Sequence, residues 1–472
     1  MLLLIFNVEA QNSYQIIINK GTDEVGGYST VDDSGNIYFT SIYWNWNDSL
    51  YYPLLYKVSA EGDTCSSSVL SQKDTIYSYN NIIRAYDGNL IIVGRGIVKN
   101  EGDIFRIVMK VNSNLEIIWL RKYHTDFQGL GTELLGHAME LKDSSIIFVG
   151  SFEGGGQRHM YAFHLTSQGD SILYKLFPPE ESGLIYSITY NPDSTLIWLH
   201  TVGVTPEITS SERVIIDHEF NILQIIDYPF YFITPFHAKL LSKTKLGVSS
   251  VFSDFTTDGF YIMAAIFDTT LILTDSILLT HPDTNAYPAW LNSIDFYYSN
   301  SIFIGGTINF QAFGGFEPSW FYITKLDTNL NIYYEKYFGG DFFYSMFSIV
   351  AMPDDGVALI GTIRDFNATV FDRDIIIIKL DTNGYVKIPE ESQIKIQSAI
   401  VYPNPGNDRL FVRTALKSVN FELFDLYGRR LKVLKINNLI TELNIANLKS
   451  GIYTWRLTNS KKILEYGKWI KN

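Results

Sequence analysis

A short motif, an acidic or polar turn followed by an apolar strand, recurs seven times in this chain of 472 residues. Successive copies are 50–56 residues apart. They begin at Asn36, Asn89, Ser145, Thr195, Lys245, Ser301 and Gly356. A regular spacing of this length is typical of repeat proteins, in which each copy is one supersecondary unit that packs on its neighbours. We therefore expect an array of seven similar units.

Each unit has the pattern of four short strands, and no helical periodicity separates the units. Phe, Trp and Tyr make up 15% of the chain, which favours pleated sheet. A tight turn such as residues 381–384 follows the third strand and contains Asp, Asn and Gly, residues that tolerate positive φ. Four strands in each of seven units predict an all-β fold, a seven-bladed β-propeller over residues 13–388. Rings of six or eight blades are the alternatives.

The two ends of the repeat region predict how the ring closes. Residues 14–18 form a strand pattern that precedes the first unit, whereas the fourth strand of the seventh unit, residues 385–388, is weak. We expect the N-terminal strand to complete the last blade, because this pairing leaves no open sheet edge.

The first ten residues, Met1–Ala10, form a short apolar stretch that ends in a small residue. This pattern is typical of the end of a secretory signal peptide, although no basic residue precedes it. An ordinary buried first strand is the alternative. No apolar run is long enough for a membrane-spanning helix. Cys65 is the only cysteine, which excludes an internal disulfide and a zinc site built from cysteines.

The charge balance reverses near residue 393. From there to the end the chain has 14 basic and 5 acidic residues, net +9, whereas the preceding part has a net charge of −22. So sharp a change marks a domain boundary, and we place a linker at residues 389–397. Alternating strand patterns and Gly-containing turns predict a small antiparallel β-sandwich over residues 398–472.

Four ordered motifs characterise this tail. They are Tyr402-Pro403-Asn404-Pro405, Asp425-Leu426-Tyr427-Gly428-Arg429, Leu448-Lys449-Ser450-Gly451-Ile452-Tyr453 and Lys468-Trp469-Ile470-Lys471. Each residue has a structural explanation by itself, since Pro favours an extended strand, Gly a tight turn and Tyr a core position. In this order, however, the motifs resemble the type A C-terminal sorting domain of the type IX secretion system.

The resemblance implies a cargo protein of a Bacteroidetes-type bacterium that is secreted or displayed at the outer cell surface. Its expected partner is the type IX machinery. The motif residues that would carry this role are Tyr402, Pro403, Asn404, Pro405, Asp425, Tyr427, Gly428, Gly451, Tyr453, Lys468 and Lys471. The basic tail has no aromatic-basic platform, so we expect no nucleic-acid binding.

Candidate ligand-binding residues lie in the connections between second and third strands, which are long and varied. These connections share one face of the ring, the long-loop face, and the short turns within each blade share the opposite face, the short-turn face. Rigid scaffolds usually carry binding residues on variable loops. The candidates are Tyr43, Trp44, Trp46, Arg158, His159, Phe313, Phe316 and Trp320. Their aromatic rings, with Phe310, could stack on a sugar or a protein loop, or could pack between blades. Arg158 and His159 could be polar site residues or solvated loop residues.

The sequence shows no catalytic motif. The histidines have no metal-binding spacing, and neither GxSxG nor a phosphate-binding glycine loop occurs. Acidic pairs such as Asp32/Asp33 and Asp354/Asp355 lie in short turns, where Asp serves turn geometry. We therefore expect no metal, no cofactor and a monomeric binding module for a glycan or protein ligand. The alternative is an extracellular hydrolase or lyase acting on polysaccharide or peptide, with carboxylates at the central channel.

Overall fold

The computed structural model describes residues 13–19, 23–45, 50–70, 75–98, 104–124, 132–154, 156–203, 211–229, 233–252, 260–280, 285–310, 317–365, 372–386, 396–397, 399–402, 404, 406–414, 416–438, 440–459 and 463–472. Parts of the sequence singled out above lie outside these ranges. They are Met1–Ala10, Trp46, Phe313, Phe316, residues 387–395 of the last strand pattern and the linker, Pro403 and Pro405.

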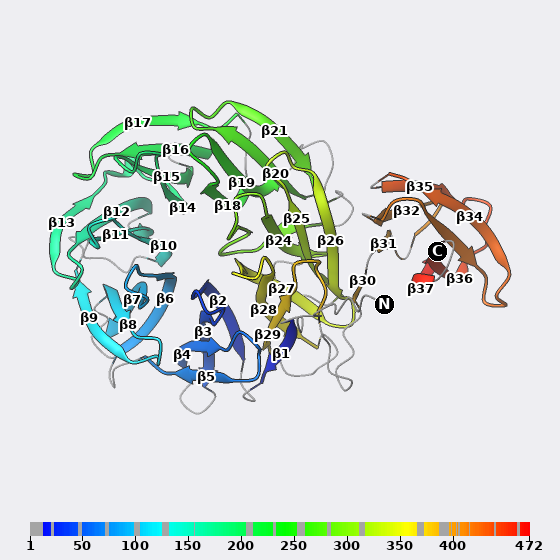
Figure 1. The fold of residues 1–472 in the computed structure, drawn as a ribbon, viewed down its shortest axis with the longest axis horizontal. Helices are drawn as coiled ribbons and strands as arrows, with labels where there is room; N and C mark the ends of the chain where they lie inside the picture. Colours follow the sequence, from blue (N-terminus) through cyan, green and yellow to red (C-terminus); the bar gives the residue numbers. More distant parts are fainter. Residues whose placement is uncertain are drawn as a thin grey trace, which may run out of the picture.

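Within the described residues, the strands before residue 398 form seven sheets arranged around a central axis, so the ring is a β-propeller (Figure 1). Blade 1 contains β2 (Glu24–Val31), β3 (Ile37–Asn45), β4 (Leu50–Val58) and β5 (Cys65–Ser68). Blade 2 contains β6 (Thr75–Arg84), β7 (Leu90–Val98), β8 (Ile104–Val111) and β9 (Ile117–Tyr123). Blade 3 contains β10 (Thr132–Glu140), β11 (Ile146–Gly154), β12 (Gln157–Leu165) and β13 (Ser171–Leu176). A 3-10 helix, η1 (Pro179–Glu181), follows.

Blade 4 contains β14 (Leu184–Tyr190), β15 (Ile197–Val202), β16 (Ser211–Ile216) and β17 (Ile222–Asp227). Blade 5 contains β18 (Ile233–Leu240), β19 (Lys245–Phe252), β20 (Tyr261–Asp268) and β21 (Leu273–Leu278). Blade 6 contains β22 (Tyr287–Pro288), β23 (Ile294–Asp295), β24 (Ile302–Ile308), β25 (Trp320–Leu326), β26 (Ile332–Gly339) and β30 (Ile396–Gln397). Blade 7 contains β27 (Phe343–Ala351), β28 (Val357–Arg364), β29 (Asp374–Leu380) and β1 (Tyr14–Ile18).

The N-terminal strand closes the ring. β1 pairs antiparallel with β29, with Tyr14 opposite Lys379 and Ile18 opposite Ile375. The predicted completion of the last blade by the first strand is thus confirmed. At the same seam Arg373 forms an ion pair with Asp23, and the Arg373 carbonyl accepts a hydrogen bond from the Glu24 amide at 2.8 Å.

Each blade also donates a hydrogen bond to a backbone carbonyl in the turn that follows the third strand of the next blade. The pairs are Tyr14–Ser59, Lys57–Ser113, Tyr123–Gly169, Lys175–Phe220, Arg213–Thr269, Lys245–Thr328 and Lys325–Thr382. These contacts join all seven described sheets in sequence around the ring. The blades are therefore fastened on the short-turn face by side chains as well as by apolar packing.

The turns that accept these bonds each place one residue at positive φ. Glycine takes the position at Gly62, Gly169 and Gly384, in accord with the predicted turn chemistry. The other four turns differ, because Leu115, Phe220, Leu271 and Leu330 occupy it at φ of 58–68°. These four side chains are buried at 7% exposure or less, so burial between blades offsets the strain of the left-handed backbone.

Each of the three glycine turns lies against an aromatic ring of the preceding blade. A side chain at Gly62, Gly169 or Gly384 would collide with the ring of Tyr14, Trp119 or Tyr334 respectively. The space between neighbouring blades is thus filled in one of two ways. Either an aromatic side chain of the preceding blade packs over a turn glycine, or the turn itself supplies a Leu or Phe side chain.

The inner strands are irregular at an equivalent place. In six blades a bulge shifts the pairing between the first and second strands, as between Gly26 and Ser29 or between Ile185 and Ser187. Blade 6 departs further, since its inner strand is split into the short strands β22 and β23. Bulges increase local twist and redirect side chains.

The tail forms two further antiparallel sheets that share one core. One contains β31 (Ala399–Tyr402), β32 (Arg409–Thr414) and β35 (Ile440–Asn444). The other contains β33 (Val419–Phe424), β34 (Arg430–Ile436), β36 (Gly451–Thr458) and β37 (Ile463–Lys471). Both contribute to a single apolar cluster around Trp455 and Trp469. Within the predicted linker, β30 pairs with β26 of blade 6.

We predict that Gly62→Ala destabilises the ring more than Gly88→Ala. Both glycines have positive φ, 74° and 83°, so alanine at either position costs about 1 kcal/mol of backbone strain. A Cβ at Gly62 would lie 2.4 Å from the Tyr14 ring, whereas nothing lies within 4 Å of one at Gly88. The collision should add about 1–3 kcal/mol, measured by urea denaturation.

The Tyr14→Ala background is the matched control, because it removes the ring that the new methyl group would strike. There, Gly62→Ala should cost no more than Gly88→Ala. An undiminished cost in that background would show that the ring contact does not set the requirement for glycine.

Candidate functional site

A cavity of about 500 Å³ lies in the central channel. Its walls come from β2, β6, β10, β14, β18, β23 and β27, the inner strands of the seven described sheets. The lining residues belong mainly to the later parts of these strands, such as residues 28–31 of β2 and 81–84 of β6. Since the inner strands run toward the short turns, the cavity lies in the half of the channel nearest the short-turn face.

Two buried histidines line the inner part of the cavity. His137 Nε2 lies 3.1 Å from the Ile185 carbonyl oxygen, and His237 Nδ1 lies 2.9 Å from Ser293 Oγ. Burial lowers the pKa of His137 to about 4. Burial, with help from nearby His137 and Lys239, lowers the pKa of His237 to about 3. Both rings are therefore neutral at pH 7, and each joins one blade to the next.

Other polar side chains of the lining also connect neighbouring blades. Ser187 Oγ accepts a hydrogen bond from the Ala238 amide at 2.9 Å. Asn292 Nδ2 donates to the Ile349 carbonyl at 2.8 Å. Much of the polarity of the channel wall is thus used to assemble the ring.

The mouth of the cavity carries charge and an exposed ring. Lys239 of β18 pairs with Asp295 of β23, and Asp295 Oδ2 also accepts a hydrogen bond from the Ala351 amide at 2.8 Å. Arg84 pairs with Asp33, which lies in the turn after β2, and this pairing lowers the pKa of Asp33. Tyr297, two residues after the end of β23, lines the cavity and is 40% exposed. The mouth therefore combines an aromatic surface with charged groups.

The aromatic residues that the sequence analysis selected lie elsewhere. Tyr43 in β3 is half-buried, and its ring stacks on Tyr52 of β4 at 5.5 Å. Trp44 follows it and is also half-buried. Trp320 begins β25 and packs against the core between blades 5 and 6, and Phe310 is buried among other aromatic rings. For Trp320 and Phe310 the structure supports the packing interpretation.

The interpretation of Arg158 and His159 as residues of a long loop is wrong. β11 extends to Gly154 and β12 begins at Gln157, so both residues belong to a strand of a tight hairpin. His159 is buried and stacks on Phe152 at 5.1 Å. Arg158 Nε lies 3.3 Å from Glu153 Oε1 on the paired strand. The glycine-rich sequence that suggested a long loop belongs to a tight hairpin between β11 and β12.

Turn hydrogen bonds and ion pairs together explain the acidic pairs. Asp32 Oδ1 accepts hydrogen bonds from the amides of Ser34 and Asn36 at 3.0 and 2.9 Å. Asp354 pairs with Lys379, and Asp355 pairs with Lys325 at 2.7 Å. The carboxylates at residues 354 and 355 thus neutralise buried lysines.

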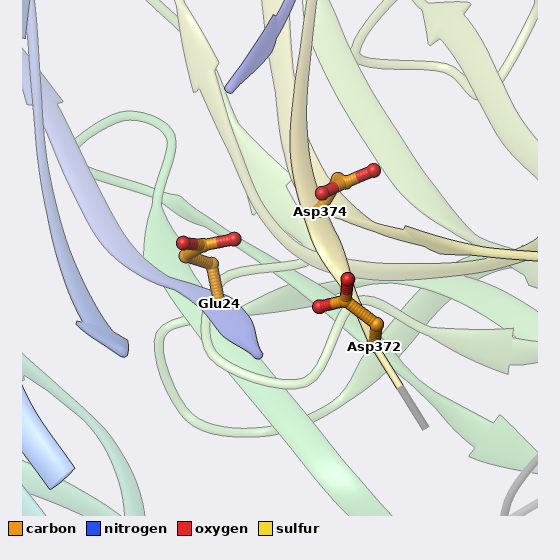
Figure 2. Close-up of side chains that lie close together, drawn as sticks. All are labelled: Glu24, Asp372 and Asp374. Carbon is orange, nitrogen blue, oxygen red and sulfur yellow. The ribbon is translucent and has the colours of Figure 1, made fainter. Parts of the chain in front are cut away.

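Three carboxylates that the sequence analysis missed converge where blade 7 meets blade 1. Glu24 at the start of β2 faces Asp374 at the start of β29 and Asp372 two residues before it, as Figure 2 shows. One oxygen of each lies within 4.8 Å of the others. Burial, together with neighbouring acids, raises the pKa of Asp372 and Asp374. Carboxylate oxygens are ligands for divalent cations such as calcium, so this set could hold one. The sequence analysis missed this cluster because Glu24 lies far along the chain from Asp372 and Asp374. The predicted pairing of the first strand with the last blade nevertheless implies that these two segments lie close together.

The motif residues of the tail stabilise its two sheets. Asp425 Oδ1 accepts hydrogen bonds from the amides of Tyr427 and Arg429, and Gly428 takes φ of 76°. Tyr427 itself is 88% exposed. Gly451 begins β36 at φ of 154°.

The remaining motifs meet at the end of the chain. Asn404 Oδ1 accepts a hydrogen bond from the Ile470 amide at 2.8 Å, and its Nδ2 donates to the carbonyl of exposed Lys468. Lys471 is buried, and its Nζ donates to the Asn407 carbonyl at 2.7 Å. Tyr453 packs its ring against Trp469, whereas Tyr402 is buried toward blade 6.

A family model described as the secretion system C-terminal sorting domain matches residues 400–472. These residues are a type IX sorting domain. Such a domain marks proteins that are secreted or attached at the outer cell surface, and it implies interaction with the secretion machinery. The sequence-based identification of the tail and of its destination is therefore confirmed. Within the described part of the chain, no helix has the length and apolarity needed to cross a membrane.

Characterised proteins give no significant sequence match. Solved structures with a similar fold include the NanB sialidase of Streptococcus pneumoniae, at 9% identity and a TM-score of 0.41 over 81% of this chain and 70% of that one. The phage phi92 endosialidase has 8% identity and a TM-score of 0.43 over 97% and 87%. The β-propeller domain of the Trilobed protease of Pyrococcus furiosus has 10% identity and a TM-score of 0.42 over 76% and 95%. Likeness at this level concerns the fold alone.

We predict that the buried histidines make the protein acid-sensitive. Below about pH 6.5 the unfolded chain binds a proton on each histidine, whereas folded His137 and His237 stay neutral down to about pH 4 and 3. The free energy of unfolding should therefore fall with decreasing pH by up to about 1.4 kcal/mol per pH unit for each. In His237→Gln this fall should be shallower when urea denaturation is compared between about pH 7 and pH 5. Parallel pH profiles for wild type and variant would contradict the assignment.

We also predict that Asp374→Asn stabilises the protein when a chelator is present. Because the folded-state pKa is raised, the carboxylate destabilises the fold above that pKa, and the penalty disappears as the pH falls below the unfolded value. The gain at neutral pH should be about 0.5–1 kcal/mol, reduced by solvent screening, and should shrink toward about pH 4. Exposed Asp227 at the end of β17 provides the control, and Asp227→Asn should leave the melting temperature unchanged.

Proposed function

We propose that this exported protein is a binding module, a seven-bladed propeller that takes a glycan at the channel mouth on its short-turn face. In this proposal the propeller spans residues 13–388, residues 389–397 connect it to the tail, and residues 398–472 form a β-sandwich whose role is export. The module acts as a monomer and needs no cofactor.

The observation that carries the proposal is the composition of the cavity mouth. Tyr297 offers part of an aromatic ring to solvent, and its ring meets Tyr298 edge to face at 5.2 Å. Lys239 and Arg84 add donors held in place by Asp295 and Asp33. Sugar rings combine an apolar face with hydroxyl groups, so an aromatic ring beside fixed polar groups is suited to bind them.

The same lining favours binding over hydrolysis. Among the described residues that line the cavity Asp295 is the one carboxylate, and Lys239 and the Ala351 amide already hold it. Asp33 lies at the mouth outside this lining, and Arg84 already holds it. Glycoside hydrolysis ordinarily uses two carboxylates on opposite sides of the scissile bond. A hydrolase or lyase acting on polysaccharide or peptide remains the second candidate, and a broad activity screen on the purified protein distinguishes it by turnover.

We predict that Tyr297→Ala weakens glycan binding about tenfold, because stacking on one ring contributes roughly 1 kcal/mol beyond area burial. A glycan array identifies the ligand, and titration calorimetry measures the dissociation constant. Tyr86→Ala is the matched control, since Tyr86 is 68% exposed on the same face but does not line the cavity.

Trp44→Ala tests the long-loop face that the sequence analysis favoured. If Trp44→Ala abolishes binding and Tyr297→Ala does not, the ligand lies on the long-loop face and the channel-mouth proposal fails. Turnover of a bound glycan would instead support the enzymatic alternative.

A further inference from the structure

A buried ion pair connects the sorting domain to the propeller. Arg413 in β32 and Glu335 in β26 both have side chains with 0% exposure, and Arg413 Nη2 lies 2.7 Å from Glu335 Oε1. Two tyrosines of blade 6 complete the network. Tyr322 donates its hydroxyl hydrogen to Glu335 Oε1 at 2.6 Å, and Arg413 Nε donates to the Tyr337 hydroxyl oxygen at 3.1 Å.

Apolar and backbone contacts surround this pair. Tyr402 of β31 joins the apolar cluster of blades 5 and 6, and Phe411 of β32 packs against the same cluster and stacks on Tyr402 at 5.5 Å. β30 adds to the outer edge of β26, with Gln397 opposite Tyr337. In Figure 1 the tail accordingly lies beside the ring next to β26.

The two kinds of contact have different consequences for association. Both ions are hydrated when the domains are apart, so the pair contributes little net affinity. Burial of Tyr402 and Phe411 supplies the driving force. The pair instead selects the orientation, because any shifted arrangement would bury a charge without its partner.

We propose that the outer edge of blade 6 is a docking site for the sorting domain, and that the domain stays bound there after the connecting chain is cut. A cut between residues 387 and 395 falls before β30. The tail fragment therefore keeps every residue with which it contacts blade 6 in the interactions described above. Cleavage of the connecting chain alone therefore leaves the sorting domain in place. This inference does not depend on the glycan proposal.

The test uses the full chain with a specific protease site substituted into residues 387–395. After cutting, the wild-type fragments should co-elute in size-exclusion chromatography at micromolar concentration. Arg413→Met and Glu335→Gln should each raise the dissociation constant about 100-fold, because each leaves the other charge buried alone. The double variant should recover most of the affinity, whereas Tyr402→Ala should weaken binding without rescue.

Arg409→Met is the matched control on the same strand. Arg409 is 69% exposed and pairs with Glu442 inside the sorting domain, so this variant should still co-elute. Separation of the wild-type fragments on cutting would overturn the proposal, as would equal losses in Arg409→Met and Arg413→Met. Should Arg413→Met fail to fold by near-ultraviolet circular dichroism, Glu335→Gln on the propeller side decides the question alone.

Discussion

The ring depends on one repeated interaction, the hydrogen bond that each blade donates to a turn of the next. A repeat protein gains stability at interfaces between units, so an open array leaves two unsatisfied ends. Here the seventh seam has the same form as the others, because Tyr14 reaches Ser59 as Lys57 reaches Ser113. Tyr14 can do so only because β1 pairs with β29 and Gly62 leaves room for the ring. At this seam the same strand, β1, therefore both completes the last blade and supplies the side chain that bonds to the next blade.

The position of the binding surface follows from that arrangement. Inner strands with bulges direct polar groups such as His137, His237 and Ser187 across the seams, where they fasten neighbouring blades. Groups committed in this way are neutral or already hydrogen-bonded and have little capacity left for a ligand. Groups available for a ligand remain at the mouth of the channel, where the Tyr297 side chain is partly exposed to solvent. The inner channel groups therefore hold the blades together, and the exposed groups at the mouth are the ones that can contact a glycan.

Local sequence patterns predicted the strands, the closing strand and the sorting motifs, because each depends on residues close together in the chain. Features set by distant residues were not predictable in this way. Glu24 meets Asp372 only through closure, and the histidines line a cavity made by seven separate strands. Arg158 and His159 were misjudged because glycines in a hairpin and in a long loop look alike. The position of Leu115 at positive φ contradicts local preference and is explained only by its burial between blades.

Charge acts on two length scales where the tail meets the ring. The tail has net charge +9 and the preceding chain −22, so their fields attract over about a Debye length of 8–10 Å and beyond at low salt. That attraction is not selective, because acidic groups are spread over the whole preceding chain. Binding at one sheet edge is selected by a contact whose loss costs free energy. The pair of Arg413 with Glu335 is such a contact, because both groups are withdrawn from water and either charge would be buried alone in a shifted arrangement. The general field thus favours encounter, and the single buried pair determines which blade receives the sorting domain.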